Sequence, residues 1–272
     1  MDNKNVFVAI ALSMSVLLFW GAFFETPKQD QKGQVKQQTE RSQNSSESLA
    51  PNINQDFLKK TISRKDALAQ VDRVNIDNEK VSGSVSLRGA IFDDLSFKKY
   101  KQKLDSNDEV VFLNPKDTSD GYFIETGWTS IGNKIKVPTA DAQWKVKGNK
   151  ILTDNDSITL EWNNDQGLIF SKKIELDEKY LFKINQSVIN NTKNKIELFP
   201  YAQITRNKKP DDVQGFYILH EGFIGVFDGE LKEDSYGDIE DRKVSRNAEN
   251  GWLGITDKYW MTAIVPPKNQ SF

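Results

Sequence analysis

The stretch Val81–Arg88 reads VSGSVSLR, and Gly89–Leu95 directly after it reads GAIFDDL. Apolar and polar residues alternate along the first stretch, which is the pattern of a β-strand with one buried face. The second stretch is apolar enough to form another strand after a turn. Together they predict a strand pair, and they indicate a β protein.

Segments of the same character recur along the rest of the chain, separated by turn residues such as Asn163–Gly167 and Asp177–Lys179. We expect strands at Val110–Leu113, Tyr122–Gly127, Ile158–Trp162, Leu168–Leu176, Tyr180–Ile189, Ile196–Thr205, Gly222–Phe227 and Trp252–Val265. About ten strands without a helix of a dozen residues between them exclude a parallel doubly wound sheet and favour a large antiparallel sandwich. Because the sequence shows no repeat of fixed period, a propeller is disfavoured.

The last of these segments contains two neighbouring strands, Gly251–Ile255 and Tyr259–Val265, joined at Thr256–Lys258. Trp252 and Trp260 fall within them, and we expect both indole rings to pack into the core.

An uncharged apolar run of nineteen residues, Val6–Phe24, precedes the β region. At about 1.5 Å per residue such a helix spans roughly 28 Å, close to the thickness of the bilayer hydrocarbon. The alternative is a cleaved signal peptide, whose apolar core is shorter and ends at small residues. Because this run ends in Trp20, Phe23 and Phe24, we favour a retained transmembrane anchor. Lysines on both sides of the run leave its orientation undecided by charge.

Between the anchor and the β region, residues 25–56 are strongly polar, and sixteen of these thirty-two residues are Ser, Thr, Asn or Gln. Such a segment cannot bury enough surface to offset its ordering entropy, so we expect a flexible tether. A short helix is expected within Phe57–Gln70, with Ser63 as its N-cap. The expected domains are therefore an anchor at residues 1–24, a tether at 25–56 and one β domain at 57–272.

Composition excludes several classes of function. The 37 basic residues are cancelled by 39 acidic ones without a basic block, which argues against nucleic acid as a partner. The chain has no cysteine, and therefore no disulfide, thiolate nucleophile or cysteine-ligated metal.

A few residues could be catalytic or could bind a metal, but for each of them another role is favoured. We therefore expect no catalytic, cofactor-binding or metal-binding residue in this chain. His220 is the only histidine; beside Glu221 it could form a catalytic pair or bind a metal, but a structural or exposed role is favoured. Asp211-Asp212 and Asp238–Asp241 could gather a hard cation, although they lack the ligand spacing and the turn glycine of a calcium loop. Solvated loop charge is therefore the favoured interpretation.

Six features occur in a fixed order along the chain: the anchor, the Gln/Ser-rich tether, the strand pair with its Ser-Leu-Arg-Gly-Ala sequence, Gly127-Trp128, His220-Glu221-Gly222 and the closing Gly251–Trp260 segment. Together they resemble the beginning of the YidC membrane insertases of Gram-negative bacteria. Of these, the segment from Gly251 to Pro266 is the most specific. Ser63–Leu68 (SRKDAL) resembles the alphaproteobacterial branch.

The resemblance implies a first transmembrane helix with a cytoplasmic N-terminus, then a periplasmic β-supersandwich akin to galactose mutarotase and truncated at its C-terminal end. It implies a non-enzymatic part of an inner-membrane insertase that assists insertion, folding and assembly. The implied partners are nascent inner-membrane proteins, the Sec translocon and the lipid bilayer. Family members continue through five further transmembrane helices, where the insertion groove would lie, so no residue of this chain is assigned that role and no cofactor is expected.

Two other functions remain open. The mutarotase analogy suggests a membrane-tethered periplasmic glycan-binding domain, with Trp128, Trp144 and Trp162 as stacking candidates, although aromatic residues in strands are more often core. The third possibility is an adaptor that docks on membrane components through an edge strand or an apolar groove.

Overall fold

The computed structural model describes Met14, residues 61–211, residue 213, residues 220–240 and residues 242–272. Apart from Met14, the expected anchor and tether lie outside these residues. Within the described part of the chain, no helix has both the length and the apolarity needed to cross a bilayer. The chain divides into two compact units, Met1–Glu47 and Ser48–Phe272, and the fold described below belongs to the second.

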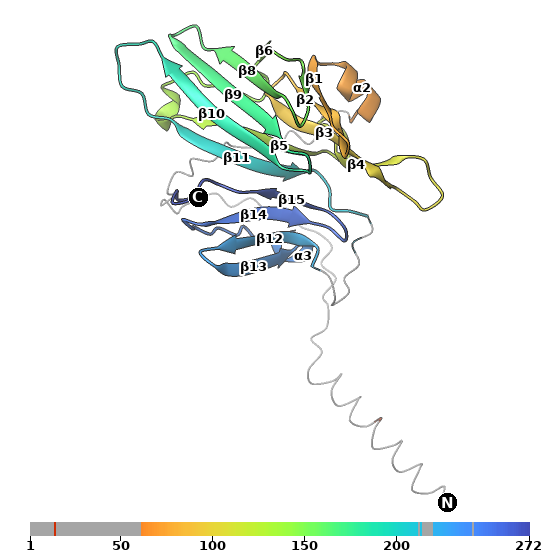
Figure 1. The fold of residues 1–272 in the computed structure, drawn as a ribbon. Coiled ribbons are helices and arrows are strands. Elements are labelled where there is room, and N and C mark those ends of the chain that lie inside the picture. The colour runs from red at the N-terminus through yellow and green to blue at the C-terminus, as the bar shows by residue number, and fades with distance from the viewer. Residues whose placement is uncertain (1–13, 15–60, 212, 214–219, 241) are drawn as a thin grey trace, which may run out of the picture. The chain divides into compact units, whose positions relative to one another are not determined.

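The largest sheet has seven strands and contains the predicted strand pair (Figure 1). Its strand order is β11-β5-β3-β2-β1-β7, with β4 paired to β3. The strands are β1 (Arg73–Asp77), β2 (Val81–Ser86), β3 (Ile91–Lys101), β4 (Glu109–Leu113), β5 (Tyr122–Thr129), β7 (Ile151–Leu152) and β11 (Phe199–Arg206). Every pairing is antiparallel except β1 with β7, which is parallel and involves two residue pairs. The sandwich is therefore antiparallel, as expected, except at this one short pairing.

Two four-stranded sheets complete the strands of the described region. The second sheet has the order β10-β9-β8-β6, from β6 (Lys145–Lys147), β8 (Ser157–Asn163), β9 (Leu168–Leu176) and β10 (Phe182–Asn190). The third has the order β13-β12-β14-β15, from β12 (Gly222–Phe227), β13 (Glu230–Ser235), β14 (Gly251–Thr256) and β15 (Met261–Ile264). The remaining elements are α2 (Arg64–Ala69), the 3-10 turn η1 (Ile131–Asn133) and α3 (Tyr236–Glu240). The prediction of a mainly β fold is confirmed.

Helix α2 begins where the sequence predicts it. The Ser63 hydroxyl accepts a hydrogen bond from the backbone N–H of Asp66 at 3.1 Å, so that one of the unpaired donors of the first turn is satisfied. The helix has only six residues, and Arg64 fastens it to the large sheet by donating to the carbonyl of Leu113 at 2.7 Å and by pairing with Asp94.

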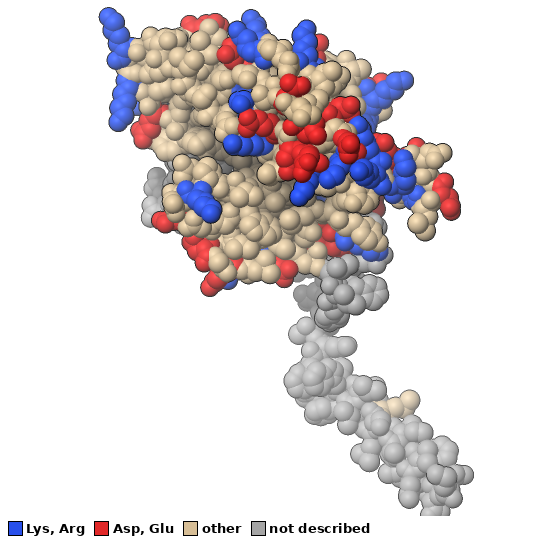
Figure 2. All heavy atoms as spheres, in the orientation of Figure 1, with Lys and Arg blue, Asp and Glu red and all other residues tan. Residues whose placement is uncertain are grey.

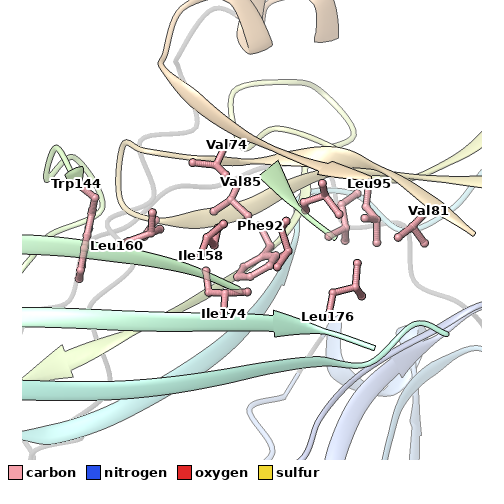
Figure 3. Packing of buried hydrophobic residues seen from close by; sticks show 14 of the residues in the cluster. Val74, Val81, Val85, Phe92, Leu95, Trp144, Ile158, Leu160, Ile174 and Leu176 are labelled. Carbon is pink, nitrogen blue, oxygen red and sulfur yellow. The ribbon is translucent and has the colours of Figure 1, made fainter. Parts of the chain in front are cut away.

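The hydrophobic core lies between the first two sheets (Figure 3). Ile158 and Ile174 from the second sheet face Val85 and Phe92 from the first, and all four are almost completely buried. This packing follows from the period of two, because alternate residues of each strand point to the same face. Burial of each such side chain contributes roughly 1.5 to 3 kcal/mol.

The third sheet is attached to the large sheet by a polar junction. The Tyr122 hydroxyl on β5 donates to Thr262 Oγ1 on β15 at 2.7 Å, and both residues are buried. The guanidinium of Arg206 on β11 lies 4.6 Å from the centre of the Tyr122 ring and forms an ion pair with Oδ2 of Asp257. The other carboxylate oxygen of Asp257 accepts a hydrogen bond from the Tyr236 hydroxyl at 2.8 Å. Strands β11 and β15 lie side by side in Figure 1, although no ladder joins them.

The expected core positions of the two closing tryptophans are only partly right. β14 and β15 pair antiparallel, as predicted. Trp260 is half-buried against the core, with its ring centre 4.5 Å from that of Phe97. Trp252 is half-buried and lies outside the core cluster, so its placement in the core is wrong.

Candidate functional site

The histidine and glutamate singled out in the sequence lie at the start of β12. His220 Nε2 is 2.8 Å from the carbonyl oxygen of Phe223, three residues further along. The Glu221 side chain is buried. The imidazole of His220 therefore contacts the local backbone, and its structural role stays a prediction.

The acidic stretches are engaged in local structure. Asp238 accepts from the backbone N–H and the hydroxyl of Ser235 at 3.0 and 2.7 Å, and so holds the start of α3. Glu240 pairs with Lys209 at 2.9 Å and Asp211 with Lys208 at 2.6 Å. Asp212 and Asp241 lie outside the described residues. Among the described residues, no group of three potential ligands stands close enough together to hold a metal ion.

The tryptophans considered for glycan stacking belong to the core. Trp128 and Trp144 are buried and stack on each other with ring centres 6.5 Å apart. Trp162 is half-buried, packs on Phe170 and carries Lys136 over its ring. Sequence analysis expected such core positions, and for Trp128 and Trp144 the expectation is confirmed.

A cleft of about 540 Å³ opens at the end of the sandwich where β5, β8 and β10 finish. Figure 1 shows this end of the strands on the left. Three loops form it: residues 130–135 after β5, the 164–168 turn between β8 and β9, and residues 192–197 between β10 and β11. Its volume is within the range usual for ligand sites. We define these three loops as the end cleft.

The floor of the end cleft is apolar and its rim is polar. Leu168 is buried, while Ile135 and Ile196 are half-buried and continuous with the core. Ile131 stands on the rim and is 51% exposed. The remaining lining residues are Ser130, Lys134, Asn164, Gln166, Thr192, Asn194, Lys195 and Glu197.

Hydrogen bonds hold the three loops of the end cleft in place. The Asn164 side chain is buried; it donates to the carbonyl of Lys136 at 3.2 Å and accepts from the backbone N–H of Gln166 and of Leu168 at 2.8 and 3.0 Å. The Gly167 carbonyl accepts from the N–H of Asn191 at 2.8 Å, which joins the second loop to the third. The cleft is therefore largely formed before a partner arrives, which reduces the ordering cost of binding.

A second polar feature, buried inside the sandwich, involves Lys172 on β9. Its side chain is 1% exposed, donates to the backbone carbonyl of Thr126 at 2.6 Å, and lies with Nζ 4.9 Å from the centre of the Trp144 ring. A void of about 10 Å³ lies beside it, lined also by Glu125 and Tyr201. The Trp144 indole N–H and the Thr126 hydroxyl are buried without a protein partner among the described residues. A void of this size and polarity suits one water molecule.

Burial controls the titration of this group. Desolvation lowers the pKa of Lys172 to about 7, and the negative charge of Glu125 opposes that shift. Burial raises the pKa of Glu125, against the effect of Lys116 and Lys172. The pKa of Tyr201 is raised by burial first and by Glu125 second. The cluster therefore changes its charge near neutral pH.

Sequence analysis missed both features. The end cleft is formed by loops that are some thirty residues apart in sequence, and no local sequence pattern predicts it. Lys172 could have been found, because it shares the inward phase of β9 with Phe170 and Ile174.

Comparison with known proteins assigns the chain to a family. A family model described as the YidC periplasmic domain matches residues 73–272. Proteins named "Membrane protein insertase YidC" are similar to the whole chain: that of Pelagibacter ubique is 40% identical over 272 residues, that of Sinorhizobium fredii 38% over 280, and that of Jannaschia sp. 36% over 291. Each alignment covers 100% of this chain but only 48%, 47% and 46% of the respective relative, so the chain spans about half their length. The resemblance seen in the sequence is thereby confirmed, and the chain belongs to the YidC periplasmic domain family.

Proposed function

We propose that this chain is the N-terminal part of a membrane protein insertase, which helps newly made proteins to enter, fold and assemble in the bacterial inner membrane, alone or with the Sec translocon. The observation that carries the proposal is the similarity of the whole chain to proteins named as insertases. The partners proposed with it are nascent inner-membrane proteins, translocon components and the lipid bilayer.

The proposed topology rests on the apolar run for the anchor and on the family resemblance for its orientation. Residues 1–24 anchor the chain with its N-terminus in the cytoplasm, residues 25–56 form the tether, and residues 57–272 form one periplasmic β domain of supersandwich type, incomplete at its C-terminal end. The apolar run Val6–Phe24 supports the anchor. Alkaline phosphatase fused after Pro51 should be active in bacterial cells; an inactive but stable fusion contradicts this orientation.

We also propose that the chain is not an enzyme. His220 contacts a local backbone carbonyl, Asp238 accepts hydrogen bonds from Ser235, and Asp211 and Glu240 form ion pairs with Lys208 and Lys209. General acid–base catalysis needs groups that converge on one reacting atom. In a full-length relative, replacing His220 and Glu221 by alanine should leave insertion of a dependent substrate near normal.

Complementation tests which part of the full-length protein carries out insertion. Expression of residues 1–272 alone should fail to rescue cells depleted of their insertase, because we place insertion in the part of the longer relatives that this chain does not cover. Rescue by the chain alone would contradict that placement. A glycan-binding function is less well supported, because the candidate stacking rings Trp128 and Trp144 are buried.

A further inference from the structure

We propose that one end of the sandwich, which we call the aromatic end, rests on the lipid headgroups of the membrane in which we place the anchor. The aromatic end consists of Phe97, Tyr100, Tyr180, Tyr259 and Trp260. The proposal rests on the proposed anchor and goes beyond it, because a flexible tether alone leaves the domain free to turn in any direction.

All three sheets contribute to the aromatic end. Phe97 and Tyr100 come from β3, Tyr180 from the turn between β9 and β10, and Tyr259 and Trp260 from the turn between β14 and β15. The ring centre of Phe97 lies 5.6 Å from that of Tyr180 and 4.5 Å from that of Trp260. The ring centres of Tyr100 and Trp260 are 4.7 Å apart. These rings therefore form one packed group, at the opposite end of β10 from the end cleft.

The outer rings of the aromatic end are exposed to solvent. Tyr259 is 72% exposed, Tyr100 45% and Tyr180 42%, and the neighbouring Leu181 is 63% exposed. Leu104 is fully exposed in the loop of the β3–β4 hairpin, which extends beyond the sheets in Figure 1. Large apolar side chains gathered at one exposed end mark a contact with a membrane or with a partner protein.

Lysines beside the exposed rings favour the membrane. Lys80 Nζ lies 5.6 Å from the centre of the Tyr180 ring, and Lys258 Nζ lies 5.1 Å from the centre of the Tyr259 ring. Tyrosine and tryptophan have an apolar body and a polar tip, and lysine can extend its amine from an apolar surface into water. Side chains of these kinds are typical of the boundary between lipid tails and water.

The charge of the turns at this end is close to balanced. Glu79 and Glu178 are exposed in the turns that also carry Lys80 and Lys179. Because acidic and basic side chains are interspersed there, the attraction to anionic lipid is small. We therefore expect the contact to form on zwitterionic lipid, through the aromatic rings.

The attachment of the tether also favours this end. The chain joins the large sheet at α2, where Arg64 pairs with Asp94 on β3. Phe97 is three residues further along the same strand, about 10 Å away. A flexible tether of thirty-two residues has an end-to-end distance on the order of 30 Å, so it keeps the domain at an effective concentration on the order of millimolar near the membrane. A weak contact between a few rings and the headgroups is then sufficient.

Two single-cysteine labels test the contact. The chain has no cysteine of its own, so Leu181→Cys places one fluorescent label at the aromatic end. Ile189→Cys places a matched label near the other end of β10, where the parent side chain is 53% exposed. The 272-residue chain is reconstituted into phosphatidylcholine vesicles that contain a headgroup-labelled nitroxide lipid. Because the labels lie roughly 26 Å apart along the strand, we expect the nitroxide to quench the Leu181 label about threefold more strongly, or more. Equal quenching of the two labels overturns the proposal.

Removal of exposed side chains locates the contact. In the Leu181→Cys chain, Tyr180→Ser/Tyr259→Ser removes two rings of the aromatic end. The matched variant Leu231→Ser/Val265→Ser removes two side chains of the third sheet that are 56% and 67% exposed. We expect the first variant to lower the quenching to that of the Ile189 label and the second to leave it unchanged; equal effects overturn the assignment. Tyr259→Ser alone provides a milder version should the double variant fail to fold, and it should lower the quenching in the same direction.

An alkaline carbonate wash of the vesicles separates this proposal from the anchor on which it rests. Retention of the chain together with equal quenching of the two labels overturns the lipid contact alone, and assigns the aromatic end to a protein partner instead. Loss of the chain from the vesicles contradicts the anchor, and it overturns the lipid contact as well.

Discussion

Replacing Lys172 by methionine should remove a large part of the pH dependence of stability. The buried amine has a pKa of about 7 in the folded protein, against 10.5 for the ordinary side chain. Between these values the unfolded chain binds more protons than the folded one, so the free energy of unfolding of the parent rises with pH. The full cost of burying the charged amine, about 5 kcal/mol, is present below pH 7 and is relieved as the pH rises from 7 toward 10.5.

Urea denaturation from pH 6 to 9, followed by tryptophan fluorescence, measures the effect. Between pH 7 and pH 9 the parent should gain about 2 kcal/mol relative to Lys172→Met. At pH 6 the methionine variant should be at least as stable as the parent, because a buried charge is replaced by an apolar side chain of similar length.

Lys173 is the matched control, since it is the next residue on β9 and its side chain is 49% exposed, paired with Glu175 at 2.6 Å. The variant Lys173→Met should keep the pH dependence of the parent. If the stability difference between the parent and Lys172→Met is constant across this pH range, the amine is not desolvated and the burial argument fails.

Four further substitutions test the packing. Trp260→Ala should lower the free energy of unfolding by about 2 kcal/mol, because its ring packs on Phe97, whereas Trp252→Ala should cost under about 1 kcal/mol; equal losses in urea denaturation would contradict the distinction. Gly251→Ala should destabilise β14 by more than about 2 kcal/mol, since its φ is 144° and a Cβ would lie 1.8 Å from the carbonyl oxygen of Val226; an unchanged thermal midpoint would refute this. Asn164→Ala should cost about 2 kcal/mol and increase amide exchange across the 164–168 turn, and unaltered exchange would show that the side chain does not hold the turn.

Sequence patterns predicted the strands whose inner faces are apolar. The alternation in β8 and β9 matches the burial observed along them, because each packs one face into the core. In β2 the alternation is not kept, because Ser84 and Ser86 are buried as well as Val85, and the register with β3 shifts between Ser84 and Val85. β1 (RVNID) was missed although its burial alternates, whereas two other missed strands have weaker patterns. β13 (ELKEDS) is a charged edge strand, and β7 has only two residues, so neither shows a period of two strongly enough to be recognised.

The candidate site was less predictable than the strands, for physical reasons. A cleft formed by three loops depends on how strands pair across the sheets, and pairing order is not encoded in any single window of sequence. Lys172 stands at a position of β9 that is in phase with the buried residues, so its inward direction could be read from the sequence. It was overlooked because a lysine within a strand is usually exposed to solvent. The prediction for Trp252 was wrong for the opposite reason. This large aromatic residue was assigned to the core, but it lies on the third sheet, outside the core cluster.

The polar junction at Tyr122 also bears on the order in which the domain assembles during synthesis. Tyr122 and Thr262 are 140 residues apart, and both sheets of the sandwich are complete once Arg206 has been made. The apolar core can therefore close around β1–β11 while the third sheet is still being translated. We expect β12–β15 to dock last, onto a surface that is already formed. The Tyr122 hydroxyl would then be in place before Thr262, its hydrogen-bond partner, has been synthesised.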